Sequence, residues 1–412
     1  MQKMVRSGRN VSLLLANMVL LGAFVKCWSQ SLTWLGVLPG GNWSVAWDIS
    51  ADGRVVVGVS DNSAGYPRAV RWQNGTMLDL GTLGGLRSWA YGVSADGSVV
   101  VGAANTSAER SRAFRWQNGT MRDLGTLGGS QSWAWAVSDD GSVVVGWANN
   151  STEYGRAFRW QNGTMRDLTT LGGNISVAYG ISPDGSCVVG EAQNTSGDYR
   201  AFAWQNGAMT NLGTLGGRRS WAWAASLNGS VIVGVSYNTS GQERAFRWTR
   251  ESGMRELGTL GGSQSVAYDV TADGLIVVGQ ARNVSGDWRA FLWTPSQGMQ
   301  DLNDTYRSLL TDGSWLSAAT AISSDGRYIV GSGYNGATNR YEAFLLDTQY
   351  ARCTVHNGDV DNNGCIDDAD ILTVLFQFGN TGANLGRVDI NCDGIVNDAD
   401  LLQVLFNFGN RC

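Results

Sequence analysis

A unit of about forty-four residues repeats along most of this chain and constrains its fold more than any other feature. The motif LGxLxGG marks the unit, and successive copies lie 44 or 45 residues apart. Copies begin at Leu35, Leu80, Leu124, Leu168, Leu212 and Leu257, with a degraded copy at Leu302. A fixed period of this size indicates a repeat architecture, in which each unit buries its apolar face against its neighbours.

Each unit has the pattern of four short antiparallel strands. In the first copy, strand-like runs at 44–50 and 55–59 are joined by an Asp-Gly turn, and two further runs are joined by Asn74-Gly75. Asn-Gly between β-favouring runs is a strong hairpin signal, because both central residues must take positive φ. Seven such units without a helical period predict an all-β fold, a seven-bladed β-propeller over residues 31–348.

The chain ends indicate that the ring is closed by an N-terminal strand. The seventh unit stops at residues 343–348 with no fourth strand after it, whereas residues 31–38 precede the first complete unit. We expect this leading segment to complete the last blade, which would leave no free sheet edge.

Two aromatic columns run through the repeats, and we expect both to be core. The first alternates with alanine on the first strand, which suggests bulky side chains packed against a neighbouring blade's small ones; it comprises Trp47, Tyr91, Trp135, Tyr179, Trp223 and Tyr268. The second lies on the third strand and comprises Trp72, Trp116, Trp160, Trp204, Trp248 and Trp293.

The motifs LGxLGG, SxDG, VVG and the AF-W block resemble the extracellular HAF repeat family of bacterial exported proteins. The resemblance covers roughly residues 31–347 and implies export and a repeat fold, but no particular activity. Where that family has His-Ala-Phe, this chain has Arg-Ala-Phe or a close variant, and its one histidine is His356, outside the ring.

The N-terminus predicts a secretory signal peptide over residues 1–29. Lys3, Arg6 and Arg9 precede an apolar run over 11–25, which is short for a membrane span. Cleavage would leave no membrane span and a protein that is secreted, extracellular or on a bacterial cell surface; an uncleaved anchor is the alternative. Lysine is absent after Lys26 and no basic stripe occurs, which argues against a nucleic-acid partner.

Catalytic chemistry has few candidates in the ring. Without histidine there, Ser-His-Asp and Cys-His catalysis and His-ligated zinc are excluded. Asp48 and Asp269 occupy a first-strand position that is Gly or Ala in the other complete copies, so they could face the channel together. A glycosidase would need two such carboxylates about 5 to 9 Å apart.

A binding face is predicted on the loops between blades, where the seventh unit carries an insertion between Leu302 and Ser323. Exposed aromatic and Arg clusters there would suit a polysaccharide or a peptide, although a tolerated loop insertion is an equal alternative. The candidate residues are Arg87, Arg218, Arg219, Tyr306, Arg307 and Trp315.

The last residues contain two loops with calcium-ligand spacing, each with glycine at position 6. Ca²⁺ takes six to eight hard oxygen ligands on a sharply turning loop, with a backbone carbonyl at position 7. We therefore predict two Ca²⁺ ions. The ligands of the first are Asp359, Asp361, Asn363, Cys365, Asp367 and Asp370. Those of the second are Asp389, Asn391, Asp393, Ile395, Asn397 and Asp400.

Each loop runs into a short apolar helix, and this duplicated loop-helix unit resembles dockerin modules, which dock onto cohesin modules in polysaccharide-degrading assemblies. The resemblance implies a dockerin-like module over residues 357–412, after a linker at 349–356. It also implies a cohesin-like protein or a cell-surface component as partner, chosen by Asp368-Ala369 and Asp398-Ala399, which replace the hydroxyl pair of the family. A calcium-clipped anchoring tail is the alternative.

Four cysteines fall within this module or at its edges. We predict disulfides Cys353–Cys412 and Cys365–Cys392, since a small core benefits from staples and export permits them. Cys187 replaces a strand valine and is expected to be a buried free thiol.

The sequence thus favours a secreted, non-enzymatic protein with a propeller for binding and a calcium module for docking. The alternative is a polysaccharide-degrading enzyme, a glycoside hydrolase or lyase, or a carbohydrate-binding component of such an assembly.

Overall fold

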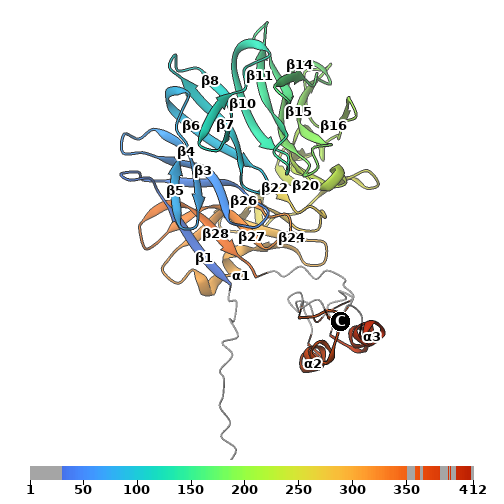
Figure 1. Cartoon of the computed structure of the whole chain (residues 1–412). Helices are drawn as coiled ribbons and strands as arrows, with labels where there is room; N and C mark the ends of the chain where they lie inside the picture. The colour runs from blue at the N-terminus through green and yellow to red at the C-terminus, as the bar shows by residue number, and fades with distance from the viewer. Residues whose placement is uncertain are drawn as a thin grey trace, which may run out of the picture.

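The computed structural model describes residues 30–349, 358–361, 365–380, 388, 390 and 396–409. The predicted signal peptide and nearly all of the predicted linker lie outside these residues. Seven four-stranded sheets form the blades of a β-propeller (Figure 1). The predicted all-β, seven-bladed fold is confirmed.

Blade 1 consists of β2 (Ser44–Ile49), β3 (Val55–Asp61), β4 (Pro67–Gln73) and β5 (Thr76–Asp79). Blade 2 consists of β6 (Gly84–Val93), β7 (Val99–Thr106), β8 (Ser111–Gln117) and β9 (Thr120–Asp123). Blade 3 consists of β10 (Gly128–Val137), β11 (Val143–Asn150), β12 (Gly155–Gln161) and β13 (Thr164–Asp167). Blade 4 consists of β14 (Gly172–Ile181), β15 (Val188–Asn194), β16 (Tyr199–Gln205) and β17 (Ala208–Asn211). Blade 5 consists of β18 (Gly216–Ala225), β19 (Ile232–Asn238), β20 (Glu243–Thr249) and β21 (Gly253–Glu256). Blade 6 consists of β22 (Gly261–Val270), β23 (Val277–Asn283), β24 (Trp288–Thr294) and β25 (Gly298–Asp301).

Blade 7 is built from both ends of the propeller. It consists of β26 (Trp315–Ile322), β27 (Tyr328–Asn335), β28 (Arg340–Asp347) and the first strand of the chain, β1 (Ser31–Gly36). The two terminal strands are antiparallel, with Ser31 opposite Asp347 and Trp34 opposite Phe344, and Figure 1 shows them side by side. The predicted closure by the N-terminal strand is therefore confirmed.

Short helices complete the described structure: η1 (Leu227–Gly229), α1 (Leu302–Thr305), η2 (Arg307–Leu309), α2 (Asp368–Gln377) and α3 (Asp398–Asn407). No helix among the described residues is long and apolar enough to cross a membrane.

The turns follow from local chemistry. Both Asn74 and Gly75 have positive φ, as the hairpin predicted from this pair requires. In the Asp-Gly turn, the Ser50 hydroxyl donates to Asp52 and accepts the N–H of Val55, so the serine and aspartate of SxDG fasten the turn between the first two strands of a blade.

The apolar core lies between the blades rather than within one of them. One cluster joins Val55 and Val57 of blade 1 to Ala90, Val100 and Phe114 of blade 2, and the same arrangement recurs around the ring. The third-strand tryptophans belong to these clusters, which confirms their predicted core role.

Buried serines fasten most blade junctions. The Ser88 hydroxyl accepts the N–H of Ala69 at 2.9 Å and donates to the carbonyl of Gly81 at 2.6 Å. Ser44 repeats the contact with Ala343 across the closure of the ring. Between blades 6 and 7, Asn303 of α1 instead forms two hydrogen bonds with the backbone of Leu316, so part of the insertion supports the fold.

Candidate functional site

An axial cavity of about 450 Å³ is lined by the innermost strands of all seven blades. In most blades the residues that border the cavity are an aromatic residue and those that follow it to the end of the strand, for example Trp47, Asp48 and Ile49. Among the lining residues, which all belong to the described propeller, none is Arg, Lys or His.

The first-strand aromatics form much of this lining, so their predicted role as core between blades is wrong. Trp47, Tyr91, Trp135, Tyr179, Trp223 and Tyr268 all border the cavity. Consecutive rings have centroids between 4.3 and 6.1 Å apart and form an arc in which Trp and Tyr alternate. The physical reason is steric: inner strands converge at the axis, the fully buried alanines such as Ala90 occupy the narrow junction, and the alternate side chain faces the channel.

The arc is interrupted in blade 7, where Thr320 takes the aromatic position. Its hydroxyl donates to the carbonyl of Ala46 at 2.8 Å. Blade 7 lies between blades 6 and 1, which carry Asp269 and Asp48. The cavity therefore has an aromatic side and a side with carboxyl groups.

Asp48 and Asp269 both line the cavity, as expected from their position on the first strand. One oxygen of Asp48 accepts the N–H of Ile49 at 2.8 Å, and the other accepts that of Val93 in blade 2, also at 2.8 Å. Asp269 bonds in the same way to Val270 and, in blade 7, to Ile322. Each carboxyl group thus ties its own blade to the next.

Burial raises the pKa of both carboxyl groups. The pKa of Asp48 is raised to about 8 by loss of water contact and by the nearby charge of Asp269, against two backbone hydrogen bonds that lower it. The pKa of Asp269 is raised to about 7, again mainly by loss of water contact. With these pKa values both groups are partly protonated near neutral pH, and a cation in the cavity would favour their charged form.

A ring of residues just beyond the inner strands borders the other end of the cavity. Backbone N–H···O=C bonds of 2.9 to 3.3 Å link neighbouring blades there, for example from Ala51 to Ala95 and from Ala272 to Ser324. Asp139 is the acid of this ring, and its side chain reaches water at the border of the cavity. Loss of part of its water contact and the charges of Asp140 and Asp184 raise the pKa of its carboxyl group.

The structure distributes the predicted binding-face residues over blades 2, 5 and 7. Arg87 lies over the ring of Tyr66 at 5.8 Å, and Arg307 pairs with Asp304 at 2.7 Å. Trp315 stacks on Tyr334 with centroids 4.3 Å apart.

Two of the predicted face residues, Tyr306 and Arg219, make side-chain contacts within the propeller. Tyr306 is buried in a core cluster because the insertion folds back as α1 and η2, so its prediction as a face residue is wrong. Arg219 lies over the rings of Tyr199 and Trp221 and pairs with Glu191 at 3.4 Å, whereas its neighbour Arg218 is exposed.

Glu191 is a residue that the sequence reasoning missed. It is buried, accepts the phenolic O–H of Tyr179 at 2.9 Å, and so connects the aromatic arc to Arg219. Burial raises its pKa, while Arg219 and Tyr179 lower it. Alignment of the repeats could have identified this residue, because Glu191 stands where other copies have residues such as Val59 or Ala103.

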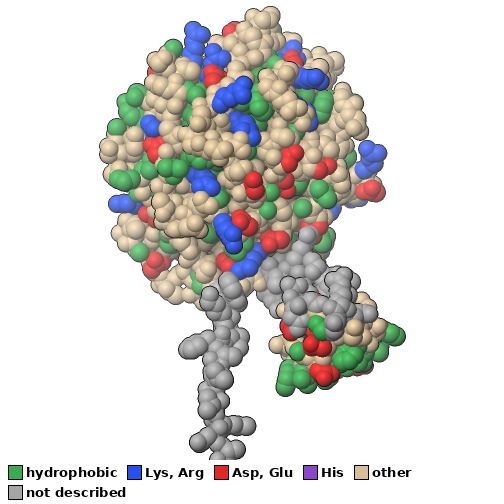
Figure 2. Space-filling view, in the orientation of Figure 1, with side chains coloured by type: hydrophobic (Ala, Val, Ile, Leu, Met, Phe, Trp, Pro, Cys, Tyr) green, Lys and Arg blue, Asp and Glu red, His purple; other side chains and the backbone are tan. Residues whose placement is uncertain are grey.

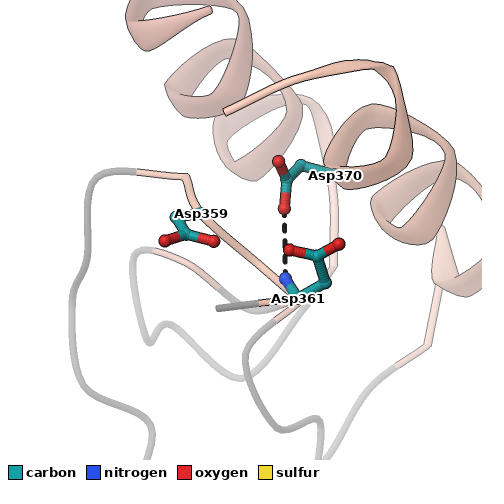
Figure 3. A group of neighbouring side chains, drawn as sticks. All are labelled: Asp359, Asp361 and Asp370. Carbon is teal, nitrogen blue, oxygen red and sulfur yellow. Dashed lines mark hydrogen bonds between the residues drawn. The ribbon is translucent and has the colours of Figure 1, made fainter. Parts of the chain in front are cut away.

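In the C-terminal part, three predicted metal ligands lie together. Oxygens of Asp359, Asp361 and Asp370 all fall within 4.8 Å of one another (Figure 3). Asp370 is held by the N–H groups of Val360 at 2.6 Å, of Asp361 at 3.1 Å and of Asp367 at 3.0 Å. Three converging carboxylates fit a hard divalent cation such as Ca²⁺, because without one their charges repel.

The second predicted loop repeats the part of this geometry that is described. Asp400 accepts the N–H of Ile390 at 2.6 Å and that of Asn397 at 2.9 Å. Asp367 and Asn397 are equivalent N-cap residues in capping boxes that begin α2 and α3. The other predicted ligands Asn363, Asp389, Asn391, Asp393 and Ile395 lie outside the described residues.

Of the four cysteines in the predicted disulfides, Cys365 is among the described residues. Cys365 is disulfide-bonded. Cys353, Cys392 and Cys412 lie outside the described residues, so both pairings stay predictions. Cys187 is buried and free, as expected.

The two C-terminal helices expose the same apolar residues. Each packs its interior side into a small core that includes Val374 and Val404. On the exposed surface, Phe376 of α2 and Phe406 of α3 keep 85% and 83% of their surface accessible, and Figure 2 shows hydrophobic and acidic side chains on the described part of this unit. The flanking exposed residues are Leu372, Leu375, Phe378, Leu402, Leu405 and Phe408. The predicted partner-choosing residues Asp368, Ala369, Asp398 and Ala399 are exposed in the first turns.

Among solved structures, the chain is similar to several propellers. TolB from Acinetobacter baumannii is 12% identical with a TM-score of 0.43, over 73% of this chain and 65% of that one, which is less than two thirds of its length. A putative TolB from Agrobacterium tumefaciens is 15% identical with a TM-score of 0.44, over 71% and 98%. The β-propeller domain of the Trilobed protease from Pyrococcus furiosus is 10% identical with a TM-score of 0.49, over 75% and 96%. No protein-family model matches the chain, and no curated protein has a significantly similar sequence.

Proposed function

We propose that this protein is a secreted, non-enzymatic binding protein. Its propeller holds a ligand, and its C-terminal dockerin-like module binds two Ca²⁺ ions and docks the chain onto a cohesin-like protein or another cell-surface component. The observation that carries the proposal is the duplicated apolar surface of α2 and α3, centred on Phe376 and Phe406.

Exposed apolar surface of this kind supports a docking role. On α2 the exposed Leu372, Leu375 and Phe376 have i, i+3, i+4 spacing, so they share one helix face. Monomeric proteins rarely leave contiguous large hydrophobic side chains in water, and such patches mark interaction sites. The equivalent residues of α3 repeat the pattern.

The metal loops support calcium dependence of the same module. The residue predicted to be the last ligand of each loop, Asp370 or Asp400, is also the third residue of a helix and bonds to its N-cap backbone. Ca²⁺ bound at these loops would fix the orientation of both helices and hence of the apolar surface.

A binding role is better supported than the polysaccharide-degrading alternative. Both oxygens of Asp48 and of Asp269 accept backbone N–H groups, which gives these carboxyl groups a structural task. The cavity that they share lies inside the ring and has the volume of a small-molecule site.

The test uses the mature full chain in a pull-down from the native secretome, in calcium and in chelator. We expect a partner that is captured with calcium and released by chelator. Phe376→Ser with Phe406→Ser should abolish capture, and Val284→Ser, which changes an equally exposed apolar residue of the propeller, should not. Capture that ignores both chelator and the double variant would contradict the proposal.

A further inference from the structure

We propose that the axial cavity binds a small organic ammonium ion, with its cationic head beside Asp48 and Asp269 and its apolar body against the aromatic arc. This inference names the ligand class for the binding role proposed for the propeller, and it rests on that role alone. The C-terminal module takes no part in it.

The aromatic arc provides a surface that attracts cations. Six rings from consecutive blades face one space, and neighbouring rings support one another at centroid distances as short as 4.3 Å. Trp and Tyr attract cations through the negative charge on their ring faces, and cages of such rings recognise alkylated ammonium groups.

The charges of the lining favour a cation as well. Asp48, Asp139 and Asp269 are its acids, and no basic side chain balances them among the lining residues. A carboxylate that is largely removed from water is costly unless a positive charge accompanies it. A cationic ligand meets that requirement, whereas an anionic ligand would be repelled.

The break in symmetry places the head of the ligand. Asp48 and Asp269 belong to the blades on either side of blade 7, where Thr320 replaces an aromatic ring. Asp48, Asp269 and the missing ring thus fall on the same side of the axis. An ammonium head suits this side, and the aromatic rings of blades 2 to 5 face it from the other.

A metal ion suits the cavity less well than an organic cation. Calcium or magnesium would need six or more oxygen ligands at once. The lining offers mainly aromatic and aliphatic surface, and the oxygens of both inner aspartates already accept backbone hydrogen bonds.

The titratable groups of the cavity predict the direction of the pH dependence. Those facing Asp48 and Asp269 are Asp139 and the phenols Tyr91, Tyr179 and Tyr268. Burial raises the pKa of all three phenols, so they stay neutral near pH 7. Glu191 and its partner Arg219 lie behind Tyr179. Binding of a cation should therefore strengthen as pH rises and the two aspartates ionise.

Calorimetric titration of the mature full chain tests the inference. The probes are choline and its uncharged carbon isostere, in which a tert-butyl group replaces the trimethylammonium group. We expect choline to bind at least about tenfold more tightly than the isostere, the size of a desolvated cation–π contribution. Choline affinity should rise between about pH 6 and about pH 8, where the aspartates ionise.

Matched variants locate the site. Asp48→Asn, Asp269→Asn and Trp135→Leu should each weaken choline binding by about tenfold or more. Asp304→Asn and Trp43→Leu, which change an exposed acid and an exposed aromatic residue outside the cavity, should leave it unchanged. Near-ultraviolet circular dichroism checks that each variant keeps its tertiary packing, and the pH dependence of the unaltered protein gives a result that needs no variant.

Three results would overturn the inference. One is equal binding of choline and its isostere, or of a neutral oligosaccharide, which would make the cavity a stacking site for uncharged ligands. Another is the absence of choline binding at about 10 mM. The third is binding that the cavity variants do not affect. Because calcium-dependent docking is measured separately, its success or failure is distinguishable from each of these.

Discussion

At the scale of single residues, the departures from the repeat carry the chemistry of this protein. Asp48 and Asp269 stand where the other complete units have Gly or Ala, and Glu191 stands where they have mostly small or apolar residues. All three are carboxyl groups whose pKa is raised mainly by burial. The fold tolerates them because each has hydrogen-bond donors in reach: backbone N–H groups for the aspartates, and Tyr179 and Arg219 for Glu191.

The raised pKa values of Asp48 and Asp269 predict that their contribution to stability falls as pH rises. With pKa values of about 8 and about 7 in the folded state and the ordinary 3.8 in the unfolded chain, the folded protein binds more protons between these limits. Stability from these groups is fully present below about pH 4 and is lost on the way to about pH 8. Within this pH range, each carboxyl group lowers the free energy of unfolding by up to about 1.4 kcal/mol per pH unit, and by less where water in the cavity screens its charge.

Urea unfolding of the full chain, followed by tryptophan fluorescence at several pH values, measures this loss. Asp48→Asn and Asp269→Asn should flatten the slope of the unfolding free energy against pH, whatever they do to its absolute value. Asp304→Asn, at an exposed site, should keep the original slope. If a variant with both Asp48→Asn and Asp269→Asn kept the original slope, the two carboxyl groups would not be the source of the pH dependence.

At the scale of elements, the glycine of the VVG motif determines how closely the first two strands of a blade approach. In blade 3, a Cβ atom at Gly146 would lie 2.0 Å from the carbonyl oxygen of Trp133 and 2.9 Å from the ring of Phe158. The same close approach recurs at Gly102, Gly190 and Gly279. This glycine is therefore needed for space, unlike the turn glycines, which are needed for positive φ.

We expect Gly146→Ala to destabilise the protein by about 3 kcal/mol or more, because both neighbours are fixed by the sheet and the core. Gly163→Ala is the matched comparison: Gly163 has φ of +81°, and no atom lies within 4 Å of the position that an added methyl group would take. It should cost about 1 kcal/mol, the strain of a left-handed residue. Equal unfolding midpoints for the two variants would refute this distinction.

At the scale of the whole molecule, one short strand closes the ring. β1 covers the edge of β28, and its Leu32 and Trp34 pack against a core cluster that includes Phe344 and Leu346. Without it, β28 would present an unpaired edge next to exposed apolar surface. Such edges pair with other chains and promote aggregation.

Removal of residues 31–36 should therefore lower the melting temperature by about 10 °C and produce oligomers on size-exclusion chromatography. A chain that begins at Gln30 is the control and should melt as a single monomeric species. A synthetic peptide of residues 31–38 should restore part of the lost melting temperature by re-pairing with β28. A truncated chain as stable and monomeric as the control would show that the ring does not depend on this closure.

Much of the architecture was predictable because it depends on local and periodic signals. Repeat length, turn pairs such as Asn74-Gly75 and the missing fourth strand of the last unit were sufficient for seven closed blades. The orientation of the first-strand aromatic side chains could not be predicted in this way. Alternation along a strand assigns side chains to two opposite faces of the sheet, but it does not tell which face is turned toward the propeller axis. Tyr306 shows the same limit, because its burial depends on how the insertion folds back onto blade 7.

The sequence by itself determined the number of blades, their strand order, the closing strand and the spacing of the acidic loops, because each of these is encoded by neighbours along the chain. Only the tertiary structure decided that the aromatic column of six blades becomes one arc, with Asp48 and Asp269 on the same side of it. These residues lie more than two hundred positions apart. They lie on the same side of the cavity because ring closure places blade 7 between blades 6 and 1, an arrangement that no local pattern contains.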